Sequence, residues 1–175
     1  MIKKVLTALL MLGCSAPVMA DERLSVEAHM RLLETVESLG VRVHINHKAF
    51  CQGQHGAYGS QPRVFIICRD SEKVTRGEWT PNDLDTIRHE AHHVVQDCLN
   101  NGLGDGEFVT AFDNEVLYEF VEQTIGAEQA ETIVETYRAN GVTDTDSLLT
   151  EVEAFAVAAS IPPSMIEQKL KEVCQ

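Results

Sequence analysis

The sequence predicts an α+β fold, a mainly helical domain with a small β-sheet or hairpin near the N-terminus. Apolar residues recur at helical spacing in residues 24–39 and again in several segments after residue 80. Runs of β-prone residues occur between residues 41 and 68. Because strands and helices are segregated along the chain instead of alternating, we expect α+β and not a parallel α/β sheet.

The first 20 residues predict an export signal. Lys3-Lys4 gives a positive start, residues 5–12 are apolar, and Val18-Met19-Ala20 resembles a small-residue cleavage site. We therefore expect cleavage near Ala20 and a periplasmic or extracellular location. Cys14 leaves a lipoprotein anchor as a less favoured alternative, because the residues before it match a lipobox poorly. No other segment has the 18 consecutive apolar residues typical of a membrane span, so none is expected.

Residues 21–175 are long enough for one domain with a hydrophobic core and too short for two of typical size. The whole chain has 27 acidic against 14 basic residues, a net charge of −13. Such a surface repels nucleic acid and anionic membranes, so neither is an expected partner. It would tolerate basic substrates.

The elements before residue 70 follow from periodicity. Residues 24–39 predict an amphipathic helix that stops at Gly40. Residues 41–45 alternate like a strand, and residues 63–68 form a second β-prone run. The region between these runs predicts turns, marked by Gly53, Gly56, Gly59, Ser60 and Pro62.

The segment 81–101 carries the clearest helix signals. Thr80 supplies an N-cap hydroxyl, Pro81 suits the first helical position, and Asp83 is acidic in the first turn. Gly102 follows as a C-terminal stop. Further helices are predicted at residues 114–125, 127–139, 144–160 and 164–173, with Pro162-Pro163 separating the last two.

The motif His89-Glu90-Ala91-His92-His93 lies on the 81–101 helix. His89 and His93 are four residues apart and share a face, so they can hold one Zn²⁺ beside Glu90 as a general base. His92 points about 60° away and is a neighbour of the site. The apolar residues lie on the opposite face, which leaves two exposed surface histidines as the alternative. The apolar residues of this helix are Leu84, Ile87, Ala91, Val94, Val95 and Cys98.

A catalytic zinc usually takes three protein ligands. Because Gln96 and Leu99 stand where a third-histidine motif needs Gly and His, the third ligand should be a carboxylate elsewhere. Glu151 and Glu153 are about 200° apart on the 144–160 helix, so one alone can face the metal. We predict Glu151, since its face is the apolar one and a cation would offset its burial. A Glu151 that reaches water at the edge of this face is the alternative.

The HExxH segment followed by Glu151-Val152-Glu153-Ala154 on a later helix resembles the gluzincin-type metallopeptidases. It is also similar to the E-x-E-A segment of small bacterial zincin-like peptidase domains. The resemblance implies a zincin-like domain with Glu151 as the zinc ligand. Many gluzincins have an Asp one residue after the Ala, where it orients a ligating histidine. This chain has Phe155 there.

These residues predict an exported zinc metallopeptidase that cleaves a peptide or protein substrate. His89, His93 and Glu151 would hold Zn²⁺, and Glu90 would deprotonate the zinc-bound water and return the proton to the leaving amine. The alternative is a non-catalytic zinc-binding or interaction module. By analogy with zincin-like peptidases, residues 63–68 or the neighbouring Tyr58 loop would bind an extended peptide.

Two sets of residues have open roles. The transition-state donor is equally well assigned to any tyrosine, that is Tyr58, Tyr118 or Tyr137. Three further histidines are candidates for a second metal site or an oxyanion donor, although loop residues are the simpler interpretation. They are His44, His47 and His55.

Four cysteines follow the predicted signal, and an even number in an exported chain predicts two disulfides. Three pairings are possible. Cys51 and Cys68 flank a predicted hairpin, which leaves Cys98 to pair with Cys174 and to tie the zinc helix to the C-terminal helix. Free, buried thiols are the alternative, less expected outside the cytosol.

Overall fold

The computed structural model describes residues 22–69 and 79–174. The predicted signal peptide, with Cys14, lies outside these ranges. The described ranges contain six helices and three strands. In chain order they are α2 (Val26–Ser38), β1 (Arg42–Ile45), β2 (Gly56–Ser60), β3 (Arg63–Ile67), α3 (Pro81–Leu99), α4 (Asn114–Thr124), α5 (Ala127–Ala139), α6 (Thr145–Ser160) and α7 (Pro163–Val173).

The predicted α+β class is confirmed, and every predicted helix is present with its ends shifted by two residues or fewer. One prediction was wrong. The region assigned to turns contains β2, whose sequence Gly-Ala-Tyr-Gly-Ser has no β-branched residue. Its conformation comes from antiparallel pairing with β3, in which Tyr58 lies opposite Phe65. Tertiary pairing therefore overrides a weak local strand preference.

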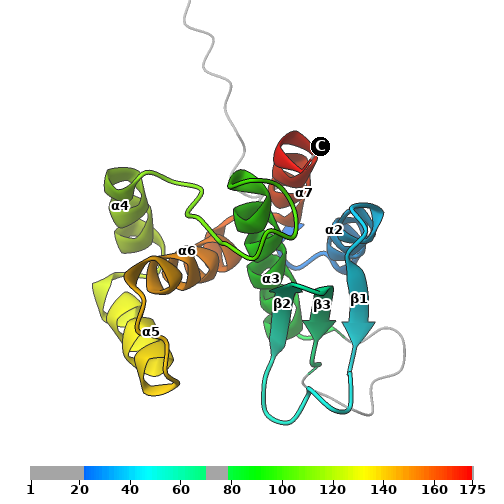
Figure 1. Ribbon diagram of the computed structural model, residues 1–175, viewed down its shortest axis with the longest axis horizontal. Helices are drawn as coiled ribbons and strands as arrows, with labels where there is room; N and C mark the ends of the chain where they lie inside the picture. Colours follow the sequence, from blue (N-terminus) through cyan, green and yellow to red (C-terminus); the bar gives the residue numbers. More distant parts are fainter. Residues whose placement is uncertain (1–21, 70–78, 175) are drawn as a thin grey trace, which may run out of the picture.

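The sheet has the order β1-β3-β2, with β1 parallel and β2 antiparallel to the central strand β3. Phe65 and Ile67 of β3 are completely buried. β2 is the edge strand that packs beside α3, as Figure 1 shows. The sheet thus brings its glycine-containing edge against the helix that carries the histidine motif.

Helix α3 is the centre of the molecule and contacts α2, α6, α7 and the sheet (Figure 1). It begins with the predicted cap, in which the Thr80 hydroxyl accepts from the Asp83 backbone N–H and the Asp83 carboxylate accepts from that of Thr80. Sequence analysis assigned only its apolar stripe to the core. The structure also buries the polar face, where His89 is 8% and His93 5% exposed. The alternative of two exposed histidines is therefore wrong.

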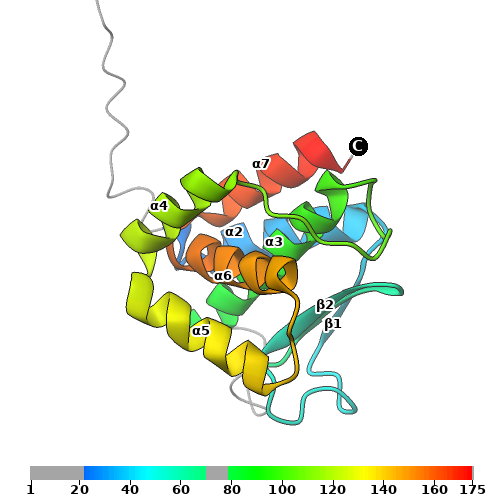
Figure 2. The ribbon, with the colours of Figure 1, turned by 60° about the vertical axis from the view of Figure 1, so that its left-hand side comes forward.

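The apolar interior has two parts. The larger cluster joins α2, α3, α7 and the sheet. The smaller one joins α4, α5 and α6 and consists of Leu117, Val121, Ile133, Val152 and Ala156. Figure 2 shows α6 between α4 and α5, with α3 behind it. Helix α6 therefore links the α4–α5 pair to the rest of the domain.

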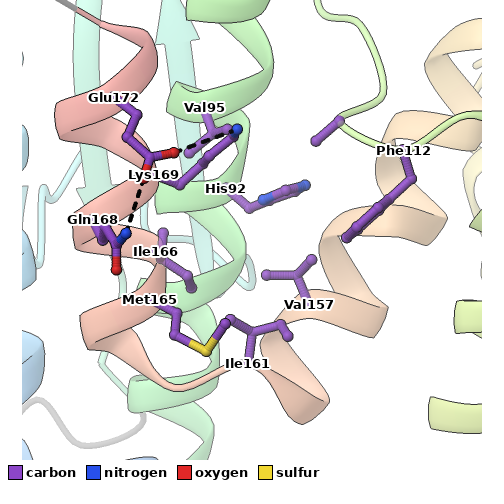
Figure 3. A pocket seen from close by; sticks show the side chains of 11 residues that line it. His92, Val95, Phe112, Val157, Ile161, Met165, Ile166, Gln168, Lys169 and Glu172 are labelled. Atoms are coloured by element: carbon purple, nitrogen blue, oxygen red, sulfur yellow. Dashed lines mark hydrogen bonds and ion pairs between the residues drawn. The ribbon is translucent and has the colours of Figure 1, made fainter. Parts of the chain in front are cut away.

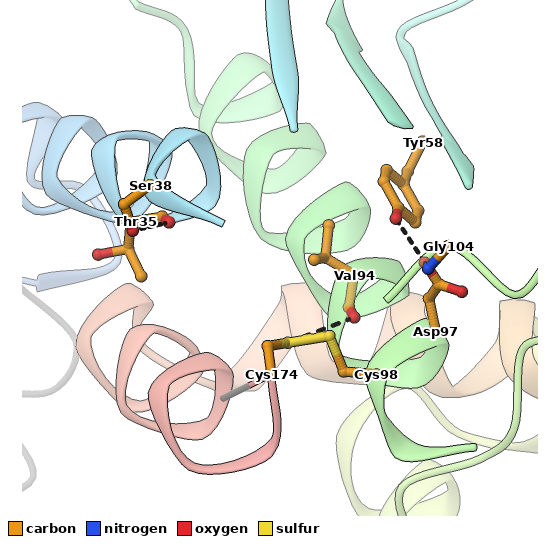
Figure 4. Close-up of a disulfide and its surroundings, with 8 residues drawn as sticks. All are labelled: Thr35, Ser38, Tyr58, Val94, Asp97, Cys98, Gly104 and Cys174. Carbon is orange, nitrogen blue, oxygen red and sulfur yellow. Dashed lines mark hydrogen bonds between the residues drawn. A yellow bond between two sulfur atoms is a disulfide. The ribbon is translucent and has the colours of Figure 1, made fainter. Parts of the chain in front are cut away.

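Both predicted disulfides are present. Cys51–Cys68 joins the segment before β2 to the end of β3, with the two Cα atoms 5.3 Å apart. Cys98–Cys174 joins the ends of α3 and α7 across a Cα distance of 5.1 Å (Figure 4). Two disulfides indicate an oxidising, exported environment. Within the described ranges, no helix combines the length and the apolar character needed to cross a membrane.

Candidate metal centre

His89 and His93 lie one turn apart on α3, with their Nε2 atoms 3.1 Å from each other. Aromatic rings hold both imidazoles in place. Phe155 of α6 meets His89 edge to face at a ring-centroid distance of 4.5 Å, and Phe108 stacks on His93 at 5.7 Å. The helical i, i+4 spacing and these rings aim the two Nε2 atoms at one point.

Glu151 of α6 reaches the same point. Its Oε2 lies 3.4 Å from the Nε2 of His89 and 3.4 Å from that of His93. With the 3.1 Å between the two imidazoles, the three atoms form a nearly equilateral triangle. Ligands at about 2.0–2.1 Å from a tetrahedral Zn²⁺ are roughly 3.3–3.4 Å apart, so the triangle has the size of three zinc ligands.

The Glu151 oxygen has a further property of a metal ligand. Oε2 is buried and accepts no hydrogen bond from any residue in the described ranges. Burial alone would raise the pKa of Glu151, but the neighbouring His89 and His93 outweigh it and hold this pKa below its usual range. Burial likewise opposes the charged form of His93, yet contact with Glu151 raises the pKa of His93 to about 9. The carboxylate is thus kept ionised, as metal binding requires.

Glu90 completes the group. His89, Glu90 and His93 offer ligand atoms within 4.8 Å of one another, so they form a cluster that can hold a metal ion. Glu90 is 6% exposed, and burial raises its pKa, opposed by His89 and His93. A carboxyl group with a raised pKa holds a proton more readily than an exposed one.

Gly56 of β2 is needed beside Glu90, although sequence analysis assigned it to a turn. A Cβ atom at this position would lie 3.0 Å from Glu90 Oε1, 2.6 Å from Thr86 Cγ2 and 2.9 Å from the Ile66 carbonyl oxygen. The backbone of the edge strand therefore approaches Glu90 more closely than a side chain at position 56 would allow.

Gln96 positions His93, a role that sequence analysis missed. The Nδ1–H of His93 donates to Gln96 Oε1 at 2.7 Å, which leaves Nε2 free to bind a metal. The Gln96 amide nitrogen donates to Glu153 at 2.9 Å and to the Thr150 carbonyl at 3.0 Å. The sequence indicates this position of Gln96, because Gln96 lies within about 20° of His89 around the helix and therefore on the same face.

Glu153 joins three parts of the chain instead of facing solvent. It is completely buried and accepts from His92 Nε2–H at 2.6 Å, from the Ala111 N–H at 2.8 Å and from the Phe112 N–H at 3.2 Å. The premise that Glu151 occupies the more buried face of α6 is therefore wrong, since the Glu151 side chain is 22% exposed. The two glutamates point to opposite sides, as predicted, and only Glu151 contacts His89 and His93.

His92 is a neighbour of the centre and not part of the triangle. Its hydrogen bond to Glu153 points it away from His89 and His93. Its ring lines a cavity of about 330 Å³ between α3, α6 and α7, together with Val157, Ile161 and Ile166 (Figure 3). Burial lowers the pKa of His92, and the hydrogen bond to Glu153 opposes this shift.

Phe155 occupies the position where many gluzincins have Asp. The Nδ1 atom of His89 is buried and has no hydrogen-bond partner in the described ranges. The ring of Phe155 packs against this imidazole instead. The described part of the chain therefore gives no hydrogen bond to Nδ1 of His89, and this imidazole is held by the ring of Phe155 and by the contacts of its Nε2 with His93 and Glu151.

The three tyrosines are no longer equivalent. Tyr58 donates its hydroxyl to Asp97 at 2.6 Å (Figure 4), and Tyr118 is 72% exposed on α4. Tyr137 of α5 is half-buried beside Glu151. Burial, and then the Glu151 carboxylate, raise the pKa of Tyr137. Tyr137 is therefore the tyrosine whose hydroxyl lies beside the candidate ligands.

The remaining candidates lie elsewhere. His44 and His47 pack edge to face, and His55 Nδ1 is 3.1 Å from the Asn82 side-chain nitrogen. Within residues 22–69 and 79–174, the cluster on α3 is the one group of three potential ligands found, so no second metal site is present there. Residues 63–67 form the central strand and are paired with both β1 and β2, so of the two candidate peptide-binding segments only the one around Tyr58, in β2, lies at an edge of the sheet.

Comparisons with protein families, with curated proteins and with solved structures find no match.

Proposed function

We propose that this protein is an exported zinc metallopeptidase of the gluzincin type, with His89, His93 and Glu151 as the ligands. The triangle of 3.1, 3.4 and 3.4 Å between their ligand atoms carries the proposal. The buried Oε2 atom of Glu151, which accepts no hydrogen bond in the described ranges, supports the proposal, because a cation would compensate its burial. Two imidazoles and a carboxylate are a donor set that favours zinc over harder cations.

A zinc ion held by these residues supplies Lewis-acid activation of water and of a carbonyl oxygen. Glu90 accepts the proton of the attacking water, holds it on the buried carboxyl group, and passes it to the leaving amide nitrogen. The raised pKa of Glu90 suits a group that must take up and release a proton. Tyr137 donates its hydroxyl to the negative charge that develops on the carbonyl oxygen.

The substrate in this proposal is an extended peptide. β2 is an edge strand, and a Cβ atom at its Gly56 would lie 3.0 Å from Glu90 Oε1, so this edge runs beside Glu90. A peptide that pairs with this edge would place a backbone carbonyl beside the general base. Peptide pairing needs backbone groups and no particular side chain, which fits an edge rich in glycine.

The first test is the metal content and activity of the purified protein. We expect one zinc per chain and cleavage of a mixed peptide library. Glu90→Gln should keep the zinc and lose cleavage, whereas His93→Ala should lose both. Glu34→Gln, an exposed change of the same kind on α2, is the control and should match the wild type. Unchanged turnover in Glu90→Gln would refute the mechanism.

A second candidate is a zinc ion that serves stability alone. Two observations favour it, because His89 and His93 are buried and Phe155, where many gluzincins have Asp, packs against His89. This candidate predicts zinc at one per chain, no cleavage of any library peptide by the wild type, and a large loss of thermal stability on chelation. Cleavage that disappears in Glu90→Gln excludes it.

A further inference from the structure

The α4–α5 pair encloses an apolar groove that the proposed catalytic centre does not use. A cavity of about 490 Å³ lies between α4, α5 and α6, and its walls are mostly apolar. Its lining includes Leu117, Val121, Ala130, Val134, Leu149 and Val152. Tyr118, which is 72% exposed, stands at its border. A pocket of this size admits several apolar side chains.

Acidic residues border this groove on both sides. Helix α4 carries one acidic stripe and α5 another, each with three exposed glutamates within about 60° of one another around the helix. The stripes are Glu115, Glu119 and Glu122 on α4, and Glu128, Glu131 and Glu135 on α5. One basic residue, Arg138, lies on the two helices. Glu122 and Glu131 line the groove itself.

These carboxylates have no counter-charge of their own. None of the six forms an ion pair with a residue in the described ranges, although pairs form elsewhere, such as Arg31–Glu27 and Lys171–Glu167. Unpaired like charges along one helix face repel one another. A cationic partner in the groove would remove this repulsion and would be attracted from a distance.

We infer that the groove between α4, α5 and α6 binds a basic amphipathic helix. The apolar floor matches an apolar stripe, and acidic borders on both sides match basic residues that flank such a stripe. A purely apolar partner would leave Glu122 and Glu131 uncompensated, and an acidic one would be repelled by them. The inference does not depend on zinc, because no candidate ligand lines the groove.

The test uses a labelled synthetic peptide of leucine and lysine, with leucine at helical spacing and a length of 13 residues, equal to that of α5. Fluorescence anisotropy measures its affinity for the whole protein, and mass spectrometry checks that the peptide stays intact. We expect binding that weakens steeply with added salt. A peptide of the same composition in scrambled order should bind at least about tenfold more weakly.

Two matched variants locate the site. Glu122→Gln with Glu131→Gln should weaken binding by about tenfold at low salt. Glu34→Gln with Glu37→Gln removes the same charge from exposed positions on α2 and should change it less than about twofold. Val134→Ser reduces the apolar lining and should also weaken binding.

Equal losses in the two charge variants would overturn the inference, since general attraction to an acidic protein would then explain the binding. Equal affinity for a peptide with glutamate in place of lysine would overturn it as well. So would a stable dimer in sedimentation that excludes the peptide, because a second copy of the chain would then occupy the groove.

Discussion

The two glutamates of the Glu151-Val152-Glu153 segment should have opposite effects when each is replaced by alanine. Glu153 is completely buried and accepts hydrogen bonds from His92, Gln96 and the backbone at residues 111 and 112. Removing it leaves four buried donors without an acceptor. Oε2 of Glu151 accepts no hydrogen bond in the described ranges, and its contacts to the two imidazoles are 3.4 Å long.

The magnitudes follow from these contacts. Each buried donor left without an acceptor costs about 1–3 kcal/mol, so Glu153→Ala, which removes the acceptor of several, should lose about 3–5 kcal/mol of free energy of unfolding. Glu151→Ala removes an ionised group whose hydration was lost on folding. It should change the free energy of unfolding of the metal-free protein by about 1 kcal/mol or less. With a urea dependence of about 2 kcal/mol per molar, these costs correspond to a midpoint shift of about 2 M against at most about 0.5 M.

The assay is urea denaturation of each protein after chelation, with both disulfides intact, followed by zinc titration of the folded protein. Glu151→Ala should unfold near the wild-type midpoint and fail to retain zinc. Glu153→Ala should unfold early yet bind zinc while it is folded. Glu153→Gln, which keeps the side-chain shape, is the second variant and should lie between the two. Equal midpoints for the two alanine variants, or zinc loss confined to Glu153→Ala, would refute the assigned roles.

Three further outcomes are expected. Gly56→Ala should lower peptidase activity more than tenfold without loss of zinc, because the added methyl group meets the backbone and Glu90; wild-type activity in a kinetic assay would contradict this. Burial lowers the pKa of His29 to about 4 from 6.5, so its neutral form stabilises the fold above pH 6.5 and about 3 kcal/mol is lost as the pH falls toward 4. His29→Gln should flatten this pH dependence of the urea midpoint. Replacing Cys98 and Cys174 by alanine should cost about 4 kcal/mol in thermal or urea unfolding, since this bridge closes a loop of 76 residues.

The sequence predicted those features that depend on local spacing. The capped helix, the i, i+4 histidines and the opposite directions of Glu151 and Glu153 all follow from helix geometry. Both disulfides were predicted from the even cysteine count and from Cys51 and Cys68 flanking a predicted hairpin, which left Cys98 and Cys174 as the second pair. The strand β2 could not be predicted, because its five residues are in extended conformation only through pairing with β3. Burial of the polar face of α3 depends equally on long-range packing by α6.

In the E-x-E segment, hydrophobic patterning selected the glutamate that lies at the two histidines, but for an incorrect reason. Patterning counts apolar neighbours, and Glu151 has more of them along α6, yet Glu153 is the fully buried carboxylate. Glu153 tolerates burial because four donors from distant residues surround it, and none of those partners can be read from α6 alone. Since a spacing of two residues turns a helix by about 200°, one glutamate holds α6 against α3 while the other faces the histidine pair. The hydrogen bonds of Glu153 therefore stabilise the contact between α6 and α3, while the contacts of Glu151 with His89 and His93 lie on the other side of α6.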